Sequence, residues 1–275
     1  MLKTRVITAV LLLAVFVPGL FFLSQAAWGI LIAIAAGVAG WEWGGLMQWE
    51  SRSRRWLGGT VLLICLICLG AFPNALGIGP EPHTPEILLP AYVLATAFWF
   101  VLVPFWLHGK YRLGRGGMAL CVGFVVILPA WLALVQLRMA GPWPLLAILA
   151  AVWLADIGAY FFGRNFGRHK LAVTISPGKT WEGAIGGGAL VLLYGLGLRQ
   201  IFAAEMMPIW QMALGLLAVT GISVVGDLFE SLLKRQIGLK DSSQILPGHG
   251  GVLDRIDSLT SALPLVALLW LVLAA

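Results

Sequence analysis

The chain has 275 residues, of which 60% are hydrophobic and only 11% are charged, and its formal net charge is +6. Soluble domains carry roughly 25% charged residues, so this composition excludes an ordinary water-soluble globular protein. Apolar runs of about 20 residues, the length of a transmembrane helix, recur along the chain, and the short alternating segments of a membrane β-barrel are not found. The sequence therefore predicts an all-α integral membrane protein, a polytopic bundle of about nine transmembrane helices.

The apolar segments follow one another in chain order, and the seventh is short and rich in glycine, which predicts close helix packing. The first segment follows Lys3 and Arg5 and ends near "SQAA", as in a signal peptide, but its length favours a retained helix. Cys65, Cys68 and Cys121 lie inside apolar runs and are predicted to be buried hydrophobic residues rather than metal ligands. The segments cover residues 6–23, 27–48, 57–76, 87–107, 118–137, 143–163, 183–198, 207–226 and 259–274.

Basic residues predict how the spans are oriented. With the N-terminus in the cytoplasm, the cytoplasmic loops are 49–56, 108–117, 164–182 and 227–258. Together with the N-terminal tail, these loops hold all but two of the 18 lysines and arginines, the exceptions being Arg138 and Arg199. This positive-inside bias predicts a cytoplasmic N-terminus, a C-terminus outside and a multi-pass position in the cytoplasmic (inner) membrane.

The polar motifs gather in residues 141–275, which are predicted to form one integrated membrane domain with the apolar helices of residues 1–140. The first motif contains Asp156, which lies within an apolar span, where an ionisable side chain is costly and indicates function. Tyr160 and Arg164 follow at i+4 and i+8, so the three residues share one helix face. A buried acid–base or Asp–Tyr pair that locks helices together is the structural alternative.

The second motif is "TISPGKTWEG", residues 174–183. Its Gly-Lys-Thr is similar to part of a phosphate-binding loop, but Val173 occupies the place of that loop's first glycine and no strand is predicted before it, which excludes a P-loop. Ser176, Lys179 and Thr180 nevertheless lie at a turn that opens a helix, where anions are favoured. These residues are candidates for phosphate binding, and contact with anionic lipid head groups is the alternative.

The third motif is a helical stripe of charged and hydroxyl side chains that share one face because of their spacing. It consists of Asp227, Glu230, Ser231, Lys234 and Arg235. An amphipathic surface helix would look similar in part, but it would not explain an aspartate at the membrane end. Lys240 and Asp241 follow in the loop.

The fourth motif, "GHGGVLDRID", combines flexible backbone with two acids. Gly248, Gly250 and Gly251 permit close approach of the backbone to a ligand, and their N–H groups are candidates for an anion-binding nest around His249. Asp254 and Asp257 can share one face of the last helix, and two carboxylates beside substrate phosphates are typical of Mg²⁺ sites. An N-terminal helix cap is the alternative. Acids beside bases at a membrane surface predict metal-assisted phosphoryl or nucleotidyl transfer.

The stretch "SLLKRQIGLKDSSQILPGHGGVLDRID" closely resembles the signature of the bacterial phosphatidate cytidylyltransferases, or CDP-diacylglycerol synthases. That signature runs Ser-x-x-Lys-Arg, four residues, Lys-Asp, a short spacer and Pro-Gly-His-Gly-Gly-x-x-Asp-Arg-x-Asp, and each fixed position is present from Ser231 to Asp257. "ADIGAYFFGR", "SPGKTWEG" and the "WEW" around Glu42 also look like motifs of that family. The resemblance covers about residues 150–260 and implies transfer of the cytidylyl group of CTP to phosphatidate, which gives CDP-diacylglycerol and pyrophosphate.

The resemblance also implies Mg²⁺ as a cofactor, with Asp227 and Asp254 as its ligands and Asp257 in support, and it leaves a second, monovalent cation open. The catalytic candidates are Asp227, Lys234, Arg235, Asp254 and Arg255. The candidates for substrate and phosphate binding are Ser176, Lys179, Thr180, Ser231, Lys240, His249, Gly250 and Gly251. Asp156 and Asp241 are supporting candidates, inferred from the residues themselves.

Two other classes of function remain as alternatives. A CTP-dependent kinase of a membrane lipid alcohol would share the nucleotide but transfer its terminal phosphate. A transporter would carry polar residues across the whole membrane depth, whereas here they collect at one face. Nucleic acid is not an expected partner, because no basic face is interleaved with exposed aromatic residues. Membrane lipids are expected partners, and spans rich in small residues are compatible with a homodimer.

Overall fold

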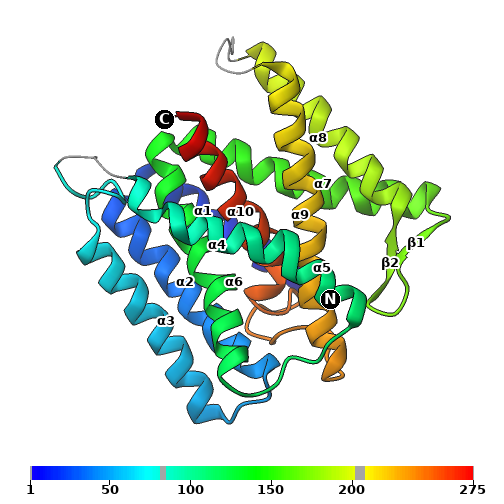
Figure 1. Ribbon diagram of the computed structural model, residues 1–275, viewed down its shortest axis with the longest axis horizontal. Coiled ribbons are helices and arrows are strands. Elements are labelled where there is room, and N and C mark those ends of the chain that lie inside the picture. The colour runs from blue at the N-terminus through cyan, green and yellow to red at the C-terminus, as the bar shows by residue number, and fades with distance from the viewer. Residues whose placement is uncertain (1, 81–84, 202–207, 275) are drawn as a thin grey trace.

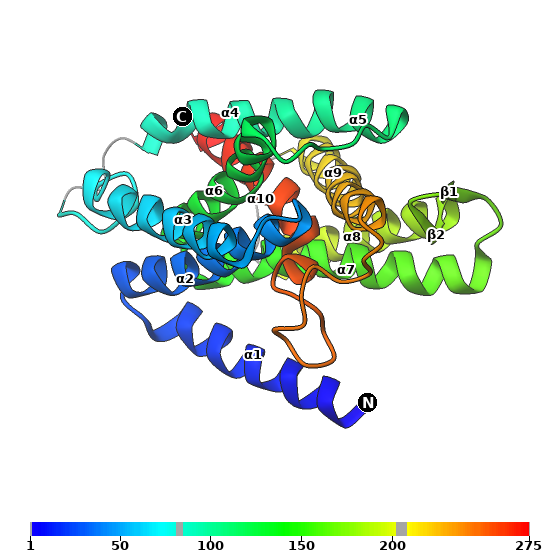
Figure 2. The ribbon, with the colours of Figure 1, turned by 90° about the horizontal axis from the view of Figure 1, so that it is seen from below.

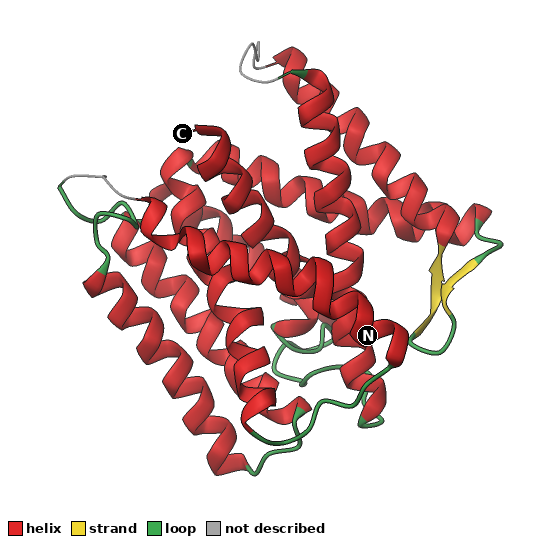
Figure 3. Cartoon of the chain, in the orientation of Figure 1, coloured by secondary structure: helices red, strands yellow, loops and turns green. Residues whose placement is uncertain are grey.

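Nine helices long and apolar enough to cross a membrane make up most of the chain in a computed structural model that describes residues 2–80, 85–201 and 208–274 (Figure 3). The prediction of an all-α polytopic membrane protein is confirmed. The helices are α1 Leu2–Phe22, α2 Gln25–Leu46, α3 Ser51–Ala71, α4 Leu89–Ala97, α5 Val103–Gly109, α6 Gly117–Leu137, α7 Pro142–Phe166, α8 Trp181–Ile201, α9 Ile209–Gln236 and α10 Leu253–Ala274.

One of the nine spans, residues 86–109, is built from several helical pieces in succession. A short 3₁₀ turn, η1 (Pro85–Leu88), leads into α4, and a π-helical turn, η2 (Phe98–Leu102), joins α4 to α5. Pro104 lies in the first turn of α5, two residues after this π turn, and proline removes one helical N–H donor. The wider turn accommodates that interruption without breaking the span.

The predicted spans differ most from the helices where polar residues begin. α9 runs to Gln236 rather than to residue 226, and α10 begins at Leu253 rather than at residue 259. Hydropathy marks the start of polar sequence as a boundary, but these helices continue because their charged side chains pair with one another. Lys234 Nζ lies 2.6 Å from Asp254 Oδ1, for example. Only residues 237–252 of the predicted 227–258 loop are outside helices.

The centre of the bundle consists of α2, α6 and α10. The apolar windows of these helices are 61%, 61% and 56% buried inside the protein, whereas that of α1 is 17% buried. Figure 2 shows α1 running along one side of the bundle, next to α2. Cys65 is buried in the core as predicted, but Cys121 is exposed, because it lies on the face of α6 that points away from the bundle.

Glycines bring α7 and α8 into close contact, as predicted for the seventh segment. A Cβ atom added to Gly187 of α8 would lie 2.6 Å from the Ala155 carbonyl oxygen of α7. A Cβ atom added to Gly158 of α7 would lie 3.0 Å from the Gly187 Cα atom. The two backbones therefore touch at these positions, and any side chain there would separate the helices.

A β-hairpin projects beyond the ends of α7 and α8 (Figure 1) and was not predicted from the sequence. Its strands are β1 (Lys170–Ala172) and β2 (Ser176–Thr180), which pair antiparallel. The hairpin is attached to α9 by a small apolar cluster in which Ile175 packs with Leu228 and Leu232. This contact places the "SPGKT" strand beside the polar stripe of α9.

Candidate active site

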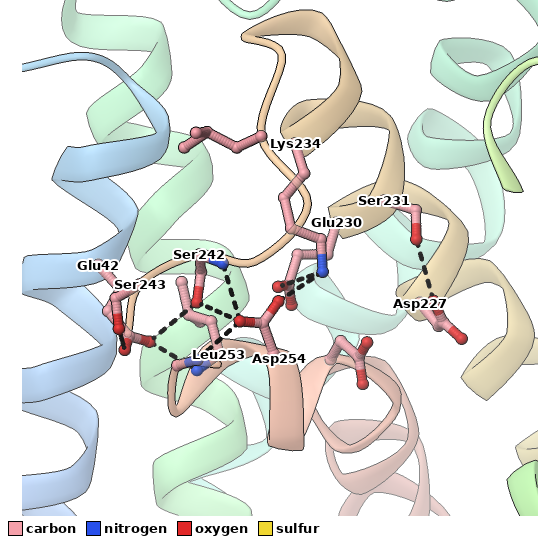
Figure 4. A network of polar contacts seen from close by, with 12 residues as sticks. Glu42, Asp227, Glu230, Ser231, Lys234, Ser242, Ser243, Leu253 and Asp254 are labelled. Atoms are coloured by element: carbon pink, nitrogen blue, oxygen red, sulfur yellow. Dashed lines mark hydrogen bonds and ion pairs between the residues drawn. The ribbon is translucent and has the colours of Figure 1, made fainter. Parts of the chain in front are cut away.

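The polar motifs meet at the end of the bundle where α9 ends and α10 begins. Figure 4 shows Glu42 on α2, Asp227, Glu230, Ser231 and Lys234 on α9, and Asp254 on α10, with the loop 237–252 between the last two helices. The side chains form two groups. One centres on Glu42 and Asp254, and the other contains the carboxylates of Asp156, Asp227 and Asp257.

Glu42 is fully buried and accepts four hydrogen bonds from the loop and the start of α10. The backbone N–H groups of Val252 and Leu253 donate at 2.9 and 2.7 Å, and the hydroxyl groups of Ser243 and Ser242 donate at 2.6 and 3.3 Å. Its carboxylate therefore caps a helix that lies far away in the sequence. No role was predicted for Glu42 from the sequence, although a carboxylate inside an apolar span is itself a signal of function.

Asp254 is saturated by protein partners. Its Oδ1 atom lies 2.6 Å from Lys234 Nζ, and its Oδ2 atom accepts hydrogen bonds from Ser242 N, Ser242 Oγ and Gly251 N at 2.8, 2.9 and 2.8 Å. Lys234 Nζ also lies 3.1 Å from Glu230 Oε1. The three charged side chains are nearly buried, and together they fix the loop against α9.

The glycines of the fourth motif approach these carboxylates. Gly250 has a φ of 82°, and a Cβ atom there would lie 2.6 Å from Asp254 Oδ2. A Cβ atom on Gly251 would meet the side chains of Ser242 and Glu42 even more closely. The sequence predicted that these glycines admit a substrate phosphate. In the structure, the carboxylates of Asp254 and Glu42 lie where a side chain at these glycines would otherwise be.

The second group brings three carboxylates together from three helices. Asp156 of α7, Asp227 of α9 and Asp257 of α10 are close enough for their charges to interact. Lys179 Nζ of the hairpin lies 2.7 Å from Asp227 Oδ2, and the Ser231 hydroxyl donates to Asp227 Oδ1 at 3.2 Å. The side chain of Asp227 is 27% exposed, so this group is open to a ligand.

Asp156 is joined to α10 through the Ser258 hydroxyl, which donates to Asp156 Oδ1 at 3.3 Å. Tyr160 and Arg164, which share its helix face in the sequence, contact each other at 3.3 Å instead of pairing with Asp156. Within residues 2–80, 85–201 and 208–274, no three His, Cys, Asp or Glu side chains are grouped closely enough to form a complete metal-ligand set.

Other predicted residues at this end of the bundle have structural partners. Thr180 is buried and caps α8, because its Oγ1 atom accepts a hydrogen bond from Gly183 N at 3.1 Å. Ser176 is half-buried in β2. The Arg235 guanidinium donates to the Leu239 carbonyl at 3.1 Å. Ser176, Lys179 and Thr180 were predicted to lie at a turn, but they belong to strand β2, which leads directly into α8, and Thr180 is already engaged by that helix.

The predicted loop residues are divided between the surface and the interior. Lys240 and Asp241 are exposed on the loop, and Arg255 is exposed in the first turn of α10. The Nδ1 atom of His249 is buried and has no hydrogen-bond partner among the described residues. His249 N donates to the Leu246 carbonyl at 2.8 Å, so its backbone helps to form the turn.

The fold and this site define a multi-pass helical membrane enzyme with paired acids and bases at one end of the bundle. The sequence profile described as "Cytidylyltransferase family" matches residues 3–273. A phosphatidate cytidylyltransferase of Pseudomonas aeruginosa is 39% identical over 279 residues, which cover 98% of this chain and 97% of the relative. One of Haemophilus influenzae is 35% identical over 286 residues, with 96% of each chain covered. The chain belongs to the cytidylyltransferase family.

Proposed function

We propose that the protein transfers the cytidylyl group of CTP to phosphatidate and releases pyrophosphate. The relatives named phosphatidate cytidylyltransferase support this activity. The structural observation that carries the proposal is the contact between two motifs far apart in the sequence. Lys179 Nζ of the "SPGKT" strand lies 2.7 Å from Asp227 Oδ2 of α9. A base and an open group of acids thus share one site, as binding of phosphates and a cation requires.

The reaction joins two anions, so the site must neutralise charge and align phosphates rather than create a nucleophile. A phosphate oxygen of phosphatidate attacks the α-phosphorus of CTP, and the bond from that phosphorus to the pyrophosphate oxygen breaks. The lipid phosphate is already ionised, so no strong general base is needed. Lys179, Arg235 and Lys240 are the proposed contacts for the triphosphate and the departing pyrophosphate.

The carboxylates of the second group suit Mg²⁺, which prefers oxygen ligands and retains several waters. Asp227 and Asp257 are the proposed ligands, with Asp156 in support, because these three groups are near one another and Asp227 is partly exposed. Asp254 would have to release Lys234 or its backbone donors before it could bind a cation. When bound, Mg²⁺ would neutralise charge on the phosphates of the nucleotide.

The active site is proposed to face the cytoplasm, where CTP is found. The lysines and arginines of the predicted cytoplasmic loops support this orientation. Phosphatidate would enter from the same leaflet, because its acyl chains remain in the bilayer.

The transfer is tested with CTP labelled at either the α- or the γ-phosphate, phosphatidate in detergent micelles, and Mg²⁺. We expect label from α-labelled CTP to enter the lipid and label from γ-labelled CTP to leave as pyrophosphate. Entry of γ-label alone would instead identify a lipid kinase. The control is Glu50→Gln, which changes an exposed carboxylate before α3 that makes no side-chain capping bond.

A further inference from the structure

An apolar cavity of about 290 Å³ lies between α1 and the central helices, on the side of α10 away from Lys234. Its walls come from α1, α2, α6, α7 and α10, and they include Phe16, Trp131 and Trp153. We infer that this cavity holds an acyl chain of the lipid substrate while Arg255 binds the lipid phosphate. The inference rests on the proposed function and adds to it the location of the lipid.

The chemistry of the lining fits a hydrocarbon chain and excludes a nucleotide. Almost all of the lining is aliphatic or aromatic, and Arg255 and Thr260 are its polar members. The volume is near the lower end of the range for small-molecule sites, about 300–1,000 Å³. Part of one acyl chain fits in such a space, and the remainder of the lipid would stay in the bilayer.

Arg255 is the feature that indicates an anionic lipid. Across the described ranges 2–80, 85–201 and 208–274, its guanidinium has no carboxylate partner, whereas Lys179 and Lys234 are both paired with aspartates. Arg255 lies in the first turn of α10, where it is exposed and also lines the cavity. An unpaired guanidinium above an apolar cavity complements a phosphate attached to a hydrocarbon chain.

Two helices connect the cavity with the carboxylates of the active site. Thr260 lines the cavity, and its hydroxyl donates to the Asp257 carbonyl oxygen at 2.7 Å. Trp153 lines the cavity on α7, three residues before Asp156, so the two lie on adjacent turns of one face. The cavity thus reaches within one helical turn of Asp156 on α7 and of Asp257 on α10, and Arg255 lies two residues before Asp257, on the cavity side of α10.

The first test is photolabelling of the full-length protein in detergent micelles with a phosphatidate that carries a diazirine near the end of one acyl chain. We expect label on α1 and α6, around Phe16 and Trp131, and we expect unlabelled phosphatidate to compete for it but phosphatidylcholine not to. Label confined to α3 or α8 would overturn the inference. Equal competition by phosphatidylcholine would do the same, because it would identify a site for bulk lipid.

The second test narrows the cavity with Ala35→Phe, at a lining position that is not tightly packed. The KM for dioleoyl phosphatidate should rise about tenfold, while kcat and the KM for CTP stay near their wild-type values. A short-chain phosphatidate should be nearly unaffected. Ala189→Phe, at an exposed position on α8, is the matched control. Equal KM changes for both lipids, or no change, would overturn the inference.

The two proposals fail in different ways. If the wild-type protein transfers no α-label from CTP to lipid, the proposed function is wrong. If transfer occurs while the photolabel maps to other helices and Ala35→Phe binds dioleoyl phosphatidate normally, only the inference about the cavity is wrong.

Discussion

Glu42 of α2 and Leu253 of α10 are joined by a hydrogen bond of 2.7 Å, from Leu253 N to Glu42 Oε2, although 211 residues separate them in the sequence. The first N–H groups of a helix have no partner within that helix and must be satisfied from outside. Here the partner is a buried carboxylate on another helix, which also binds the serines of the connecting loop. The loop before α10 is thus held to the N-terminal half by the Glu42 carboxylate, and also by the Thr8 hydroxyl, which donates to the Pro247 carbonyl at 2.9 Å.

Glu42→Gln should lower the unfolding temperature and the rate of cytidylyl transfer together. The amide nitrogen of the glutamine would face N–H or hydroxyl groups that now donate hydrogen bonds to a carboxylate oxygen of Glu42. An unsatisfied buried donor costs about 1–3 kcal/mol. Thermal unfolding in detergent and the labelled-CTP assay measure the two effects. Glu50→Gln is the matched control, because Glu50 is the N-cap residue of α3 but makes no side-chain capping bond. An unchanged unfolding temperature would contradict this role of Glu42.

Lys179→Gln should impair binding of CTP with little effect on stability. The Lys179 and Asp227 side chains are 22% and 27% exposed, and pairs this accessible to solvent contribute about 0–1 kcal/mol. A charged hydrogen bond to a phosphate contributes about 1.5–3 kcal/mol, so the KM for CTP should rise about tenfold or more. Lys170→Gln, at an exposed position on the same hairpin, is the control. A large fall in unfolding temperature with an unchanged KM would show that the pair is only structural.

Removal of divalent cations should abolish transfer, and Mg²⁺ should restore it. Asp227→Asn should raise the Mg²⁺ concentration for half-maximal activity at least about tenfold, because an amide oxygen is a weaker ligand for a hard cation than a carboxylate. A titration of activity with Mg²⁺ after treatment with a chelator measures this shift. The same titration of Glu50→Gln should match the wild type, because Glu50 is exposed at the start of α3 and makes no side-chain capping bond. Identical titration curves for Asp227→Asn and the wild type would exclude Asp227 as a ligand.

The Asp254→Asn variant should be both less active and less stable than the wild type, whereas Asp227→Asn should lower activity without lowering the unfolding temperature. Lys234 would keep Glu230 as a partner but lose its 2.6 Å contact, and breaking a buried ion pair costs about 3 kcal/mol or more. Comparing the thermal unfolding of the two variants distinguishes a structural role of Asp254 from the metal-binding role proposed for Asp227. A variant that unfolds like the wild type but is inactive would instead place Asp254 among the metal ligands.

Hydropathy was sufficient to predict the nine spans of the described residues, because each contains an apolar run long enough to cross a bilayer, but it ended α9 too early and began α10 too late. Helical spacing also placed Asp227 and Ser231 on one face, and their side chains are in contact. The contacts that organise the site could not be predicted in this way, because Glu42–Leu253 and Asp156–Ser258 join residues that are distant in sequence. The glycine-rich turn was predicted to let the backbone approach a phosphate. The sequence alone cannot show that the Asp254 carboxylate lies against Gly250.

Arg138 was an exception to the predicted charge bias, and the structure explains it. Its side chain is 9% exposed and donates to the Leu20 and Leu23 carbonyls at the end of α1, at 3.0 and 2.5 Å, and to Gln25 Oε1 at 3.1 Å. The last carbonyls of a helix have no intrahelical partner, and a cation stabilises them. Arg138 therefore connects α1 with α2 and with the end of α6.

Arg138→Leu should loosen α1 and open the apolar cavity that α1 covers. The substitution leaves buried carbonyls unsatisfied, so the unfolding temperature should fall by an amount that corresponds to about 1–3 kcal/mol. With Cys121 replaced by serine in both backgrounds, a cysteine introduced at Ile32, a buried position that lines the cavity, should react faster with a maleimide in the Arg138→Leu background than in the wild-type background. Arg52→Leu, which removes an exposed arginine of α3, should leave both measurements unchanged. If the cysteine reacts at the same rate in both backgrounds, Arg138 does not hold α1 against the cavity.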